Sequence, residues 1–212
     1  MIQVDFFTFN PISENTYLLS NEDRDAIIID PGCYFPAEEE ILKTHISLNN
    51  LKPVQLLNTH CHLDHVFGNS WVARTYHLEL NLHPMEEKML KLAPASGRMY
   101  GLEFENYQGA LHFLQEGDII RLGKEELHVI FVPGHSPGSI CFYAPESNFL
   151  IGGDVLFFES IGRTDLPGGD LPLLLNGIRE KLFCLPDDTL VYPGHGPKTT
   201  IGYEKKNNQF LK

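Results

Sequence analysis

The sequence predicts an α/β fold in which two β-sheets lie face to face and helices cover both outer sides. Short apolar runs of strand length recur along all 212 residues, and groups of them are followed by segments with apolar residues at helical spacing. Two sheets packed face to face, with helices on their outer sides, bury the apolar residues of such strands and helices. No linker rich in Ser, Pro or Gly divides the chain, so we expect a single domain, residues 1–212, made of two similar halves.

The first half is expected to open as a meander of strands bounded by turn residues. The predicted strands cover residues 2–9, 15–20, 26–29, 54–57 and 78–82. Acidic residues complement the dipole at a helix N-terminus, and Asn and Pro are favoured at helix starts. On these signals, helices are expected over 37–43, after Pro36, over 69–74, capped by Asn69, and over 85–92, begun by Pro84.

The second half is expected to begin with an unstructured stretch. Residues 93–109 contain Pro94 and three glycines with little periodicity, which predicts an irregular loop or a mobile flap over the site. Further strands and one more helix follow. The strands are predicted over 113–122, 126–132, 140–143, 149–151 and 190–192, and the helix over 171–185.

Charge and composition exclude several classes of function. Asp and Glu outnumber Lys and Arg by 28 to 16, giving a net charge of −12, which opposes binding to nucleic acid. No run reaches membrane-spanning length, and the start of the chain lacks a basic region followed by an apolar core. We therefore expect no membrane partner and a cytoplasmic location. The four cysteines form no Cys-x-x-Cys pair and are expected to be free thiols, namely Cys33, Cys61, Cys141 and Cys184.

The strongest candidate site follows the predicted strand 54–57. Four potential metal ligands occur within six residues there, as His60-x-His62-x-Asp64-His65. In extended backbone His60 and His62 point the same way, and a turn brings the last two residues to a second position nearby. Packing alone is a poor explanation for three histidines and an aspartate in this spacing, because each buried imidazole needs its own polar partner.

Three distant segments repeat the arrangement of an apolar strand followed by a loop that carries a ligand. The loops contain Gly134-His135, Gly153-Asp154 and Gly194-His195. Glycine lets the backbone turn sharply where the side chain must project. Imidazole and carboxylate groups in one site are suited to zinc, iron or manganese.

These motifs resemble those of the metallo-β-lactamase superfamily, which also has Gly-His-Ser-Pro-Gly-Ser, Gly-Gly-Asp and Pro-Gly-His-Gly segments. The resemblance implies a four-layer αββα sandwich with two mixed sheets and helices on both outer faces. It also implies two divalent metal ions, Zn²⁺ first, with iron or manganese as alternatives. The implied ligands are His60, His62 and His135 for one ion, Asp64, His65 and His195 for the other, and Asp154 as the bridge.

The same resemblance implies a reaction. Asp64 and Asp154 would hold a metal-bridging hydroxide that attacks a carbonyl, so no side-chain nucleophile is needed. Asp30, in an Asp-Pro-Gly turn, resembles an aspartate that supports the site from behind the ligands. A plain turn-capping role is the alternative for this residue. Because the metal site would be net positive, an anionic substrate is favoured.

Two further segments, 161–170 and 199–204, are similar to compact bacterial proteins of the glyoxalase II type. This likeness implies hydrolysis of a small acyl thioester, in the manner of a hydroxyacylglutathione hydrolase. The expected substrate contacts are Arg163, Tyr100, Arg98 and Tyr34. A buried pair of Arg163 with Asp165 is the structural alternative. The carboxy-terminal helical domain with which longer glyoxalase II enzymes hold glutathione has no counterpart in 212 residues, so recognition of glutathione is not carried over.

Other functions remain open on the sequence. A mononuclear iron persulfide dioxygenase would hold iron with His60, His135 and Asp154, and Cys61 within the motif favours it. A non-catalytic metal-binding domain is a further alternative, although retention of all seven ligands weighs against it. Hydrolysis of β-lactam antibiotics is disfavoured, because secreted zinc β-lactamases often place a Cys ligand near the position of Asp154 and carry an export signal. The sequence does not predict an oligomeric state.

Overall fold

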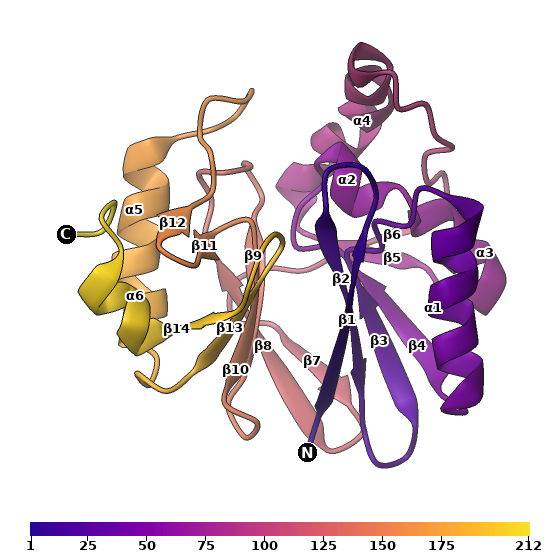
Figure 1. Cartoon of the computed structure of the whole chain (residues 1–212), viewed down its shortest axis with the longest axis horizontal. Helices are drawn as coiled ribbons and strands as arrows, with labels where there is room; N and C mark the ends of the chain where they lie inside the picture. Colours follow the sequence, from indigo (N-terminus) through magenta and orange to yellow (C-terminus); the bar gives the residue numbers. More distant parts are fainter.

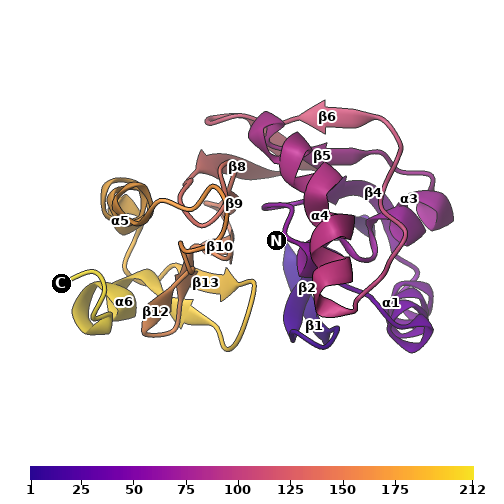
Figure 2. The same cartoon turned by 90° about the horizontal axis from the view of Figure 1, so that it is seen from above.

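The computed structural model describes residues 1–212 and contains two six-stranded sheets that face each other. Figure 1 shows α5 and α6 outside one sheet and α1, α3 and α4 on the side of the other. The view from above in Figure 2 shows the same layers, with the two sheets between the helices. The predicted four-layer αββα sandwich is confirmed.

Both sheets are mixed, as predicted. The first has the order β1-β2-β3-β4-β5-β6, antiparallel from β1 to β3 and parallel from β3 to β6. Its strands are β1 (Gln3–Phe9), β2 (Glu14–Ser20), β3 (Asp25–Ile29), β4 (Lys52–Leu57), β5 (Leu80–Leu82) and β6 (Leu111–Phe113). The second has the order β14-β13-β10-β9-β8-β7, in which only β10 and β13 are parallel. Its strands are β7 (Ile119–Leu122), β8 (Glu125–Phe131), β9 (Ile140–Ala144), β10 (Phe149–Gly153), β13 (Leu190–Pro193) and β14 (Thr199–Thr200).

A short hairpin and eight helical segments complete the chain. The hairpin pairs β11 (Leu156–Phe157) with β12 (Ser160–Ile161). The helices are α1 (Pro36–Leu48), α2 (Leu63–Val66), α3 (Asn69–Tyr76), α4 (Glu87–Tyr100), α5 (Leu171–Glu180) and α6 (Ile201–Asn207), with 3-10 turns η1 (Pro84–Glu86) and η2 (Leu182–Cys184). None of these helices has the length and apolar character needed to cross a membrane.

The alternation of side chains along the strands divides the apolar residues among three cores. In β2, Leu19 points between the sheets while Leu18 points to the helices of the first sheet. The inter-sheet core joins residues such as Leu19 and Ile27 to Phe142 and Val129 of the second sheet. Because both faces of each sheet are buried, the central strands read as continuous apolar runs.

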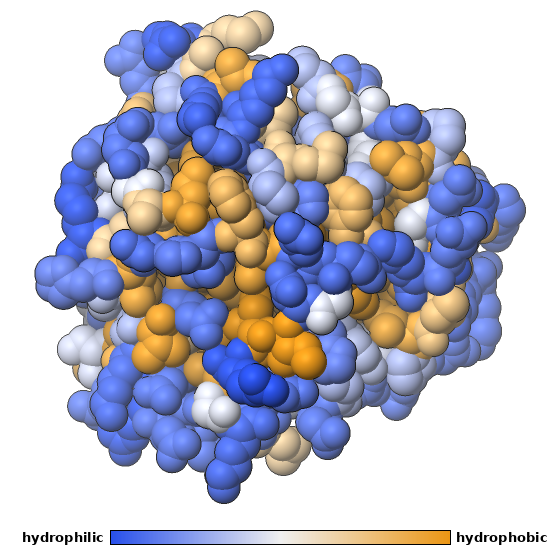
Figure 3. All heavy atoms as spheres, turned by 180° about the vertical axis from the view of Figure 1, so that it is seen from behind, coloured by the Kyte–Doolittle hydropathy of each residue, from blue (hydrophilic) through white to orange (hydrophobic).

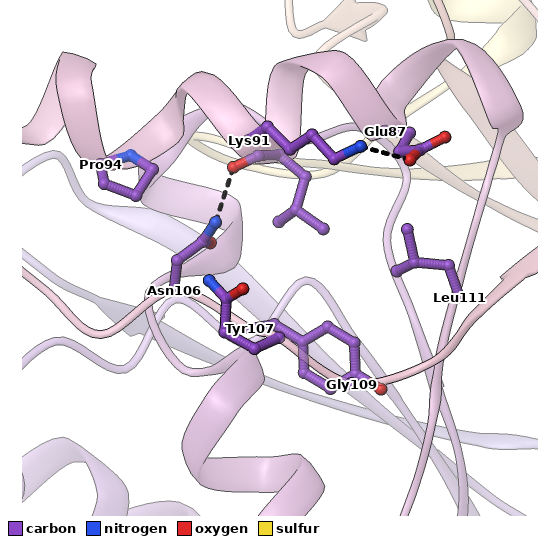
Figure 4. Close-up of a pocket in the computed structure, with 9 residues that line it drawn as sticks. Glu87, Lys91, Pro94, Asn106, Tyr107, Gly109 and Leu111 are labelled. Atoms are coloured by element: carbon purple, nitrogen blue, oxygen red, sulfur yellow. Dashed lines mark hydrogen bonds and ion pairs between the residues drawn. The ribbon is translucent and has the colours of Figure 1, made fainter.

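The stretch 93–109 was predicted to be irregular, and this prediction is wrong for residues 93–100, because α4 continues to Tyr100, but it is confirmed for residues 101–109, which form no helix or strand. Pro94 has no N–H to donate to the carbonyl of Leu90, and the side chain of Asn106 donates to that carbonyl instead, at 2.8 Å (Figure 4). Gly97 allows a close approach, since a Cβ there would clash with the carbonyl oxygen of Leu102. Pro94 and Gly97, which the sequence suggested would break the helix, are thus both accommodated by contacts with the segment that follows α4.

Two other predicted elements differ from the structure. The strand expected over 113–122 is divided, because β6 ends at Phe113 in the first sheet and β7 begins at Ile119 in the second. The chain crosses between the sheets there. The helix expected over 171–185 ends at Glu180 and is followed by the separate turn η2.

The face opposite to that of Figure 1 carries apolar side chains among hydrophilic ones (Figure 3). Exposed large apolar residues are spread over several elements, for example Phe6, Val54 and Ile119. Apolar atoms make up more than half of the surface of ordinary folded proteins. Scattered residues of this kind are therefore consistent with an ordinary folded surface.

Replacement of Leu19 by Ala tests the inter-sheet core. Leu19 is fully buried between the sheets, so Leu19→Ala is expected to lower the free energy of unfolding by about 2–5 kcal/mol through lost apolar burial and a cavity. Chemical denaturation followed by circular dichroism measures it. Leu48→Ala, at a side chain that is 77% exposed, is the control and should change stability by less than about 0.5 kcal/mol. Equal effects of the two substitutions would contradict the assignment of the core.

Candidate metal centre

All seven predicted ligands come together where strands of the two sheets end. His60 and His62 follow β4, and α2 carries Asp64 and His65. The other three follow β8, β10 and β13 and are His135, Asp154 and His195. Their potential ligand atoms form two groups, in each of which the atoms lie within 4.8 Å of one another: His60, His62 and His135, and Asp64, His65 and His195.

The first group consists of three imidazoles. Nε2 of His135 lies 2.8 Å from Nδ1 of His62 and 3.2 Å from Nε2 of His60. Burial, together with neighbouring histidines, lowers the pKa of His62 to about 3 and that of His60 well below its usual value. Burial also lowers the pKa of His135. These rings are therefore neutral at neutral pH and can offer lone pairs to a cation.

The second group combines histidines with a carboxylate. Oδ2 of Asp64 lies 3.1 Å from Nε2 of His195 and 3.8 Å from Nε2 of His65. Burial alone would lower the pKa of His65, but the carboxylates of Asp154 and Asp64 raise it well above its usual value. Burial would raise the pKa of Asp64, but His65 and His195 hold it below the usual range. The second group thus contains an ionised carboxylate, which the first group lacks, beside histidines whose protonated form that carboxylate favours.

Asp154 lies between the two groups. Its carboxylate oxygens are 3.4 Å from Nε2 of His135, 3.4 Å from Nε2 of His65 and 3.5 Å from Nε2 of His195. Burial would raise its pKa, but His65 and His135 keep it well below the usual value. One carboxylate therefore contacts both groups, which is the position of a bridging ligand.

Several buried atoms in this centre lack hydrogen-bond partners. They are Nε2 of His62, Nε2 of His65 and Oδ1 of Asp154. An unpaired buried polar atom is costly unless something satisfies it. Nitrogen and carboxylate donors that converge without partners fit divalent transition metals, so the residues present suit the ions that the family binds.

The outer nitrogens of the histidines fix their orientation. Nδ1 of His65 donates to Asp30, Nδ1 of His135 to the carbonyl of Arg163, and Nδ1 of His195 to the carbonyl of Ser13. Donation from Nδ1 leaves the lone pair on Nε2, which faces the centre in each case. The arrangement prepares these three rings to bind a metal through Nε2.

Asp30 lies near His60 and His65 and could by distance be counted as a ligand. Its oxygens are already engaged, however. They accept hydrogen bonds from Asn58 Nδ2, from the N–H and Oγ1 of Thr59, and from Nδ1 of His65. A saturated carboxylate orients its neighbours, so Asp30 has the supporting position that the resemblance implies.

Glycine next to a ligand allows close packing at the centre. A Cβ at Gly194 would clash with Oδ1 of Asp154, so only glycine fits beside this carboxylate. The same loop is held by Asn15, whose Nδ2 donates to the carbonyls of Pro193 and Gly196. β2 of the first sheet thereby positions a ligand that follows β13 of the second.

Sequence reasoning missed Glu86, which ties two ligand loops together. Its buried carboxylate accepts hydrogen bonds from the N–H of Cys61 at 2.7 Å, from Oγ of Ser136 at 2.6 Å and from the N–H of Gly138 at 2.6 Å. Cys61 lies between His60 and His62, and Ser136 follows His135. Glu86 therefore connects the two loops that carry the first group. Its place in an acidic helix start provided no signal of this role.

A cavity of about 850 Å³ opens onto the centre. Of the predicted substrate contacts, Arg163 and Tyr100 line it, whereas Arg98 and Tyr34 do not. The ring of Tyr34 packs against Phe35 and Phe67.

Arg163 and Asp165 do form a pair, through two hydrogen bonds of 2.7 Å. The pair is exposed rather than buried as the structural alternative proposed, with side chains 58% and 67% accessible. Because this segment follows the hairpin as a surface loop, water reaches both charges.

Replacement of Glu86 by Gln tests whether the hydrogen bonds of Glu86 hold the two ligand loops together. In either orientation the amide NH₂ that Glu86→Gln introduces would face a backbone N–H, of Cys61 or of Gly138, so at least one hydrogen bond is lost. We expect the affinity of the first group for Zn²⁺ to fall by about 10–100-fold, as measured by competition with a chromophoric chelator.

Glu87→Gln is the matched control for this substitution, because Glu87 forms a surface pair with Lys91. This variant should bind Zn²⁺ as the wild type does. If Glu86→Gln also retains wild-type affinity and thermal stability, Glu86 does not position the ligand loops.

Comparison with known proteins supports the geometry. A family model described as the metallo-beta-lactamase superfamily matches residues 10–195. The "Probable metallo-hydrolase YqgX" of Bacillus subtilis is 38% identical, with 95% of this chain and 93% of that protein covered. The "Hydroxyacylglutathione hydrolase GloC" of Haemophilus influenzae is 35% identical, with 99% and 98% covered.

Solved structures show the same fold at full length. The BLEG-1 B3 metallo-beta-lactamase is 39% identical with a TM-score of 0.91, covering 99% of this chain and 100% of that one. TTHA1623, solved in a di-iron-bound form, is 36% identical with a TM-score of 0.89, covering 98% and 100%. With a family match over most of its length and metallo-hydrolases among its relatives, this chain belongs to the metallo-β-lactamase superfamily.

Proposed function

We propose that this protein is a dinuclear metal-dependent hydrolase of a small, anionic acyl thioester. The observation that carries the proposal is the position of Asp154, whose carboxylate contacts both ligand groups at 3.4–3.5 Å. Two ligand groups that share one carboxylate are typical of sites that hold two ions. The similarity to a protein named hydroxyacylglutathione hydrolase supports the thioester as substrate, and the relative solved with two irons supports the number of ions.

Two divalent ions in such a site polarise a carbonyl oxygen and lower the pKa of a shared water molecule. We propose Zn²⁺ as the first candidate, with iron or manganese as alternatives. The chain contributes the ligands, their orientation through Asp30 and Glu86, and a cavity beside them. The cavity would give a substrate carbonyl access to the ions, which would supply the chemistry.

The side chains near the centre are not built as nucleophiles. Oγ of Ser136 donates to the carboxylate of Glu86 and is fully buried. Burial raises the pKa of the Cys61 thiol well above its usual value, and a neutral thiol is a weak nucleophile. Both observations agree with a reaction in which water attacks, without a covalent acyl-enzyme.

Hydrolysis of β-lactams is a second candidate function. The sequence disfavoured it because Asp154 stands where many secreted β-lactamases have a Cys ligand. The similarity over the full length to a protein named a B3 metallo-beta-lactamase favours it. A carbonyl adjacent to a cleavable bond is common to both substrates, so the same centre could serve either reaction.

Replacement of His195 by Ala tests the two-metal proposal. We expect about two metal ions per wild-type chain and about one in His195→Ala, measured by elemental analysis after loading with Zn²⁺. Thiol release from acyl thioesters should fall by at least about 100-fold, because a ligand of the second ion is lost. His128→Ala is the control, since this histidine lies in β8 outside both ligand groups.

The outcomes separate the alternatives. Hydrolysis of nitrocefin with no thioesterase activity would establish β-lactam hydrolysis as the function instead. The dioxygenase that His60, His135 and Asp154 could support would be established by three results together. These are one iron per wild-type chain, oxygen uptake that depends on persulfide, and a His195→Ala variant that retains this oxygen uptake. Absence of all three activities in fully metal-loaded protein would leave a metal-binding domain and overturn the proposal.

A further inference from the structure

Helix α4 has a buried apolar face and, next to it, large apolar side chains that are only partly buried or exposed. Leu90, Ala93 and Gly97 form the buried face. Leu92 and Met99 lie on a neighbouring face at helical spacing and line the cavity beside the metal centre, together with Met89, which also packs against the core. Leu92 is 45% exposed and Met99 84% exposed. A row of large apolar side chains that faces open space requires an explanation other than packing.

The other walls of the cavity have the same character. Ile12 contributes from the turn between β1 and β2, Phe157 from the β11–β12 hairpin, and Leu166 from the loop that follows it. Twelve of the 22 lining residues are hydrophobic, and most of the polar ones are the metal ligands. The cavity is therefore polar at the centre and apolar along its walls.

The cavity offers little charge for a polar ligand. Its lining contains no lysine, and Arg163 is the only arginine. Both Nε and Nη2 of that guanidinium already donate to the carboxylate of Asp165. A glutathione thioester brings two carboxylates, and beyond the metals the walls provide no unpaired cation to match them.

We propose that this cavity binds the hydrocarbon part of an acyl thioester along the apolar face of α4, and that it selects apolar acyl chains over the glutathione conjugate of a hydroxy acid. The proposal rests on the proposed thioesterase function and specifies its substrate class. The apolar face is continuous with the cavity that ends at the metal ligands. A chain lying on it would place its carbonyl beside the centre.

A series of acyl thioesters of 3-mercaptopropionate, from acetyl to hexanoyl, tests the selection. This thiol carries one carboxylate, so the substrates stay small and anionic while only the hydrocarbon changes. We expect kcat/KM of the Zn²⁺-loaded protein to rise about fourfold for each added methylene, the factor that burial of one CH₂ supplies. S-lactoylglutathione should be a poorer substrate than the butyryl ester.

A matched pair of double variants assigns the effect to α4. Leu92→Gln/Met99→Gln keeps the side chains similar in size but removes their apolar character, and it should flatten the rise with chain length. Lys88→Gln/Ala95→Gln has the same spacing on the same helix at exposed positions that do not line the cavity. This control should retain the wild-type rise. Because all four positions are exposed, neither variant is expected to unfold the protein.

Binding measurements separate this inference from the proposed activity. Calorimetry with the straight-chain carboxylates butyrate, hexanoate and octanoate on Zn²⁺-loaded protein should show tighter binding with each added methylene in the wild type and no such trend in Leu92→Gln/Met99→Gln. If that trend appears without thioester hydrolysis, the proposed function is wrong and the apolar subsite remains. If hydrolysis occurs but both chain-length trends are flat, or S-lactoylglutathione is preferred, the inference is overturned.

Discussion

Two buried carboxylates, those of Asp30 and Glu86, hold most of the candidate metal-binding histidines in place beyond the ends of the strands. The candidate ligands follow the ends of β4, β8, β10 and β13, and of these residues only His195 is paired with a neighbouring strand, through an isolated bridge to Glu14. Asp30 accepts four hydrogen bonds from residues 58–65, and Glu86 accepts three from the two loops that carry the first group. Charged acceptors of this kind are stronger than neutral ones and costly to leave unpaired. The positions of the histidines in residues 60–65 and of His135 therefore depend on them, whereas His195 is held by Ser13.

That the seven candidate ligands come together could be predicted from the sequence, because their signal is local. Each follows an apolar strand within a few residues, and glycine precedes His135, Asp154 and His195 directly. Glu86 had no such signal, since its partners are 25 to 52 residues distant in the sequence. The helical course of residues 93–100 was hidden for the same reason. The donor that replaces the missing N–H of Pro94 is the side chain of Asn106, in a segment that the sequence does not visibly connect to the helix.

The substrate contacts were harder to predict than the metal ligands. Arg98 and Tyr100 lie close together in the sequence, but a helix turns successive side chains by about 100° and so points these two in different directions. Tyr100 consequently lines the cavity while Arg98 does not. The choice of basic residues as anchors for an anion also overlooked neutralisation by a neighbour, since Nε and Nη2 of Arg163 both donate to the carboxylate of Asp165.

Helix α4 meets the centre on one side and a separate small cleft on another. Figure 4 shows this cleft, where Glu87, Lys91 and Pro94 face Asn106, Tyr107 and Leu111. The hydroxyl of Tyr107 accepts from the N–H of Leu80 and donates to the carbonyl of Ala110, which ties this segment to β5. None of these contacts involves a metal ligand. The hydrogen bonds of Asp30 and Glu86 to the loops of the metal centre likewise involve neither Leu92 nor Met99. Substitutions at these two positions on the cavity face of α4 therefore leave the contacts that hold the candidate ligands in place.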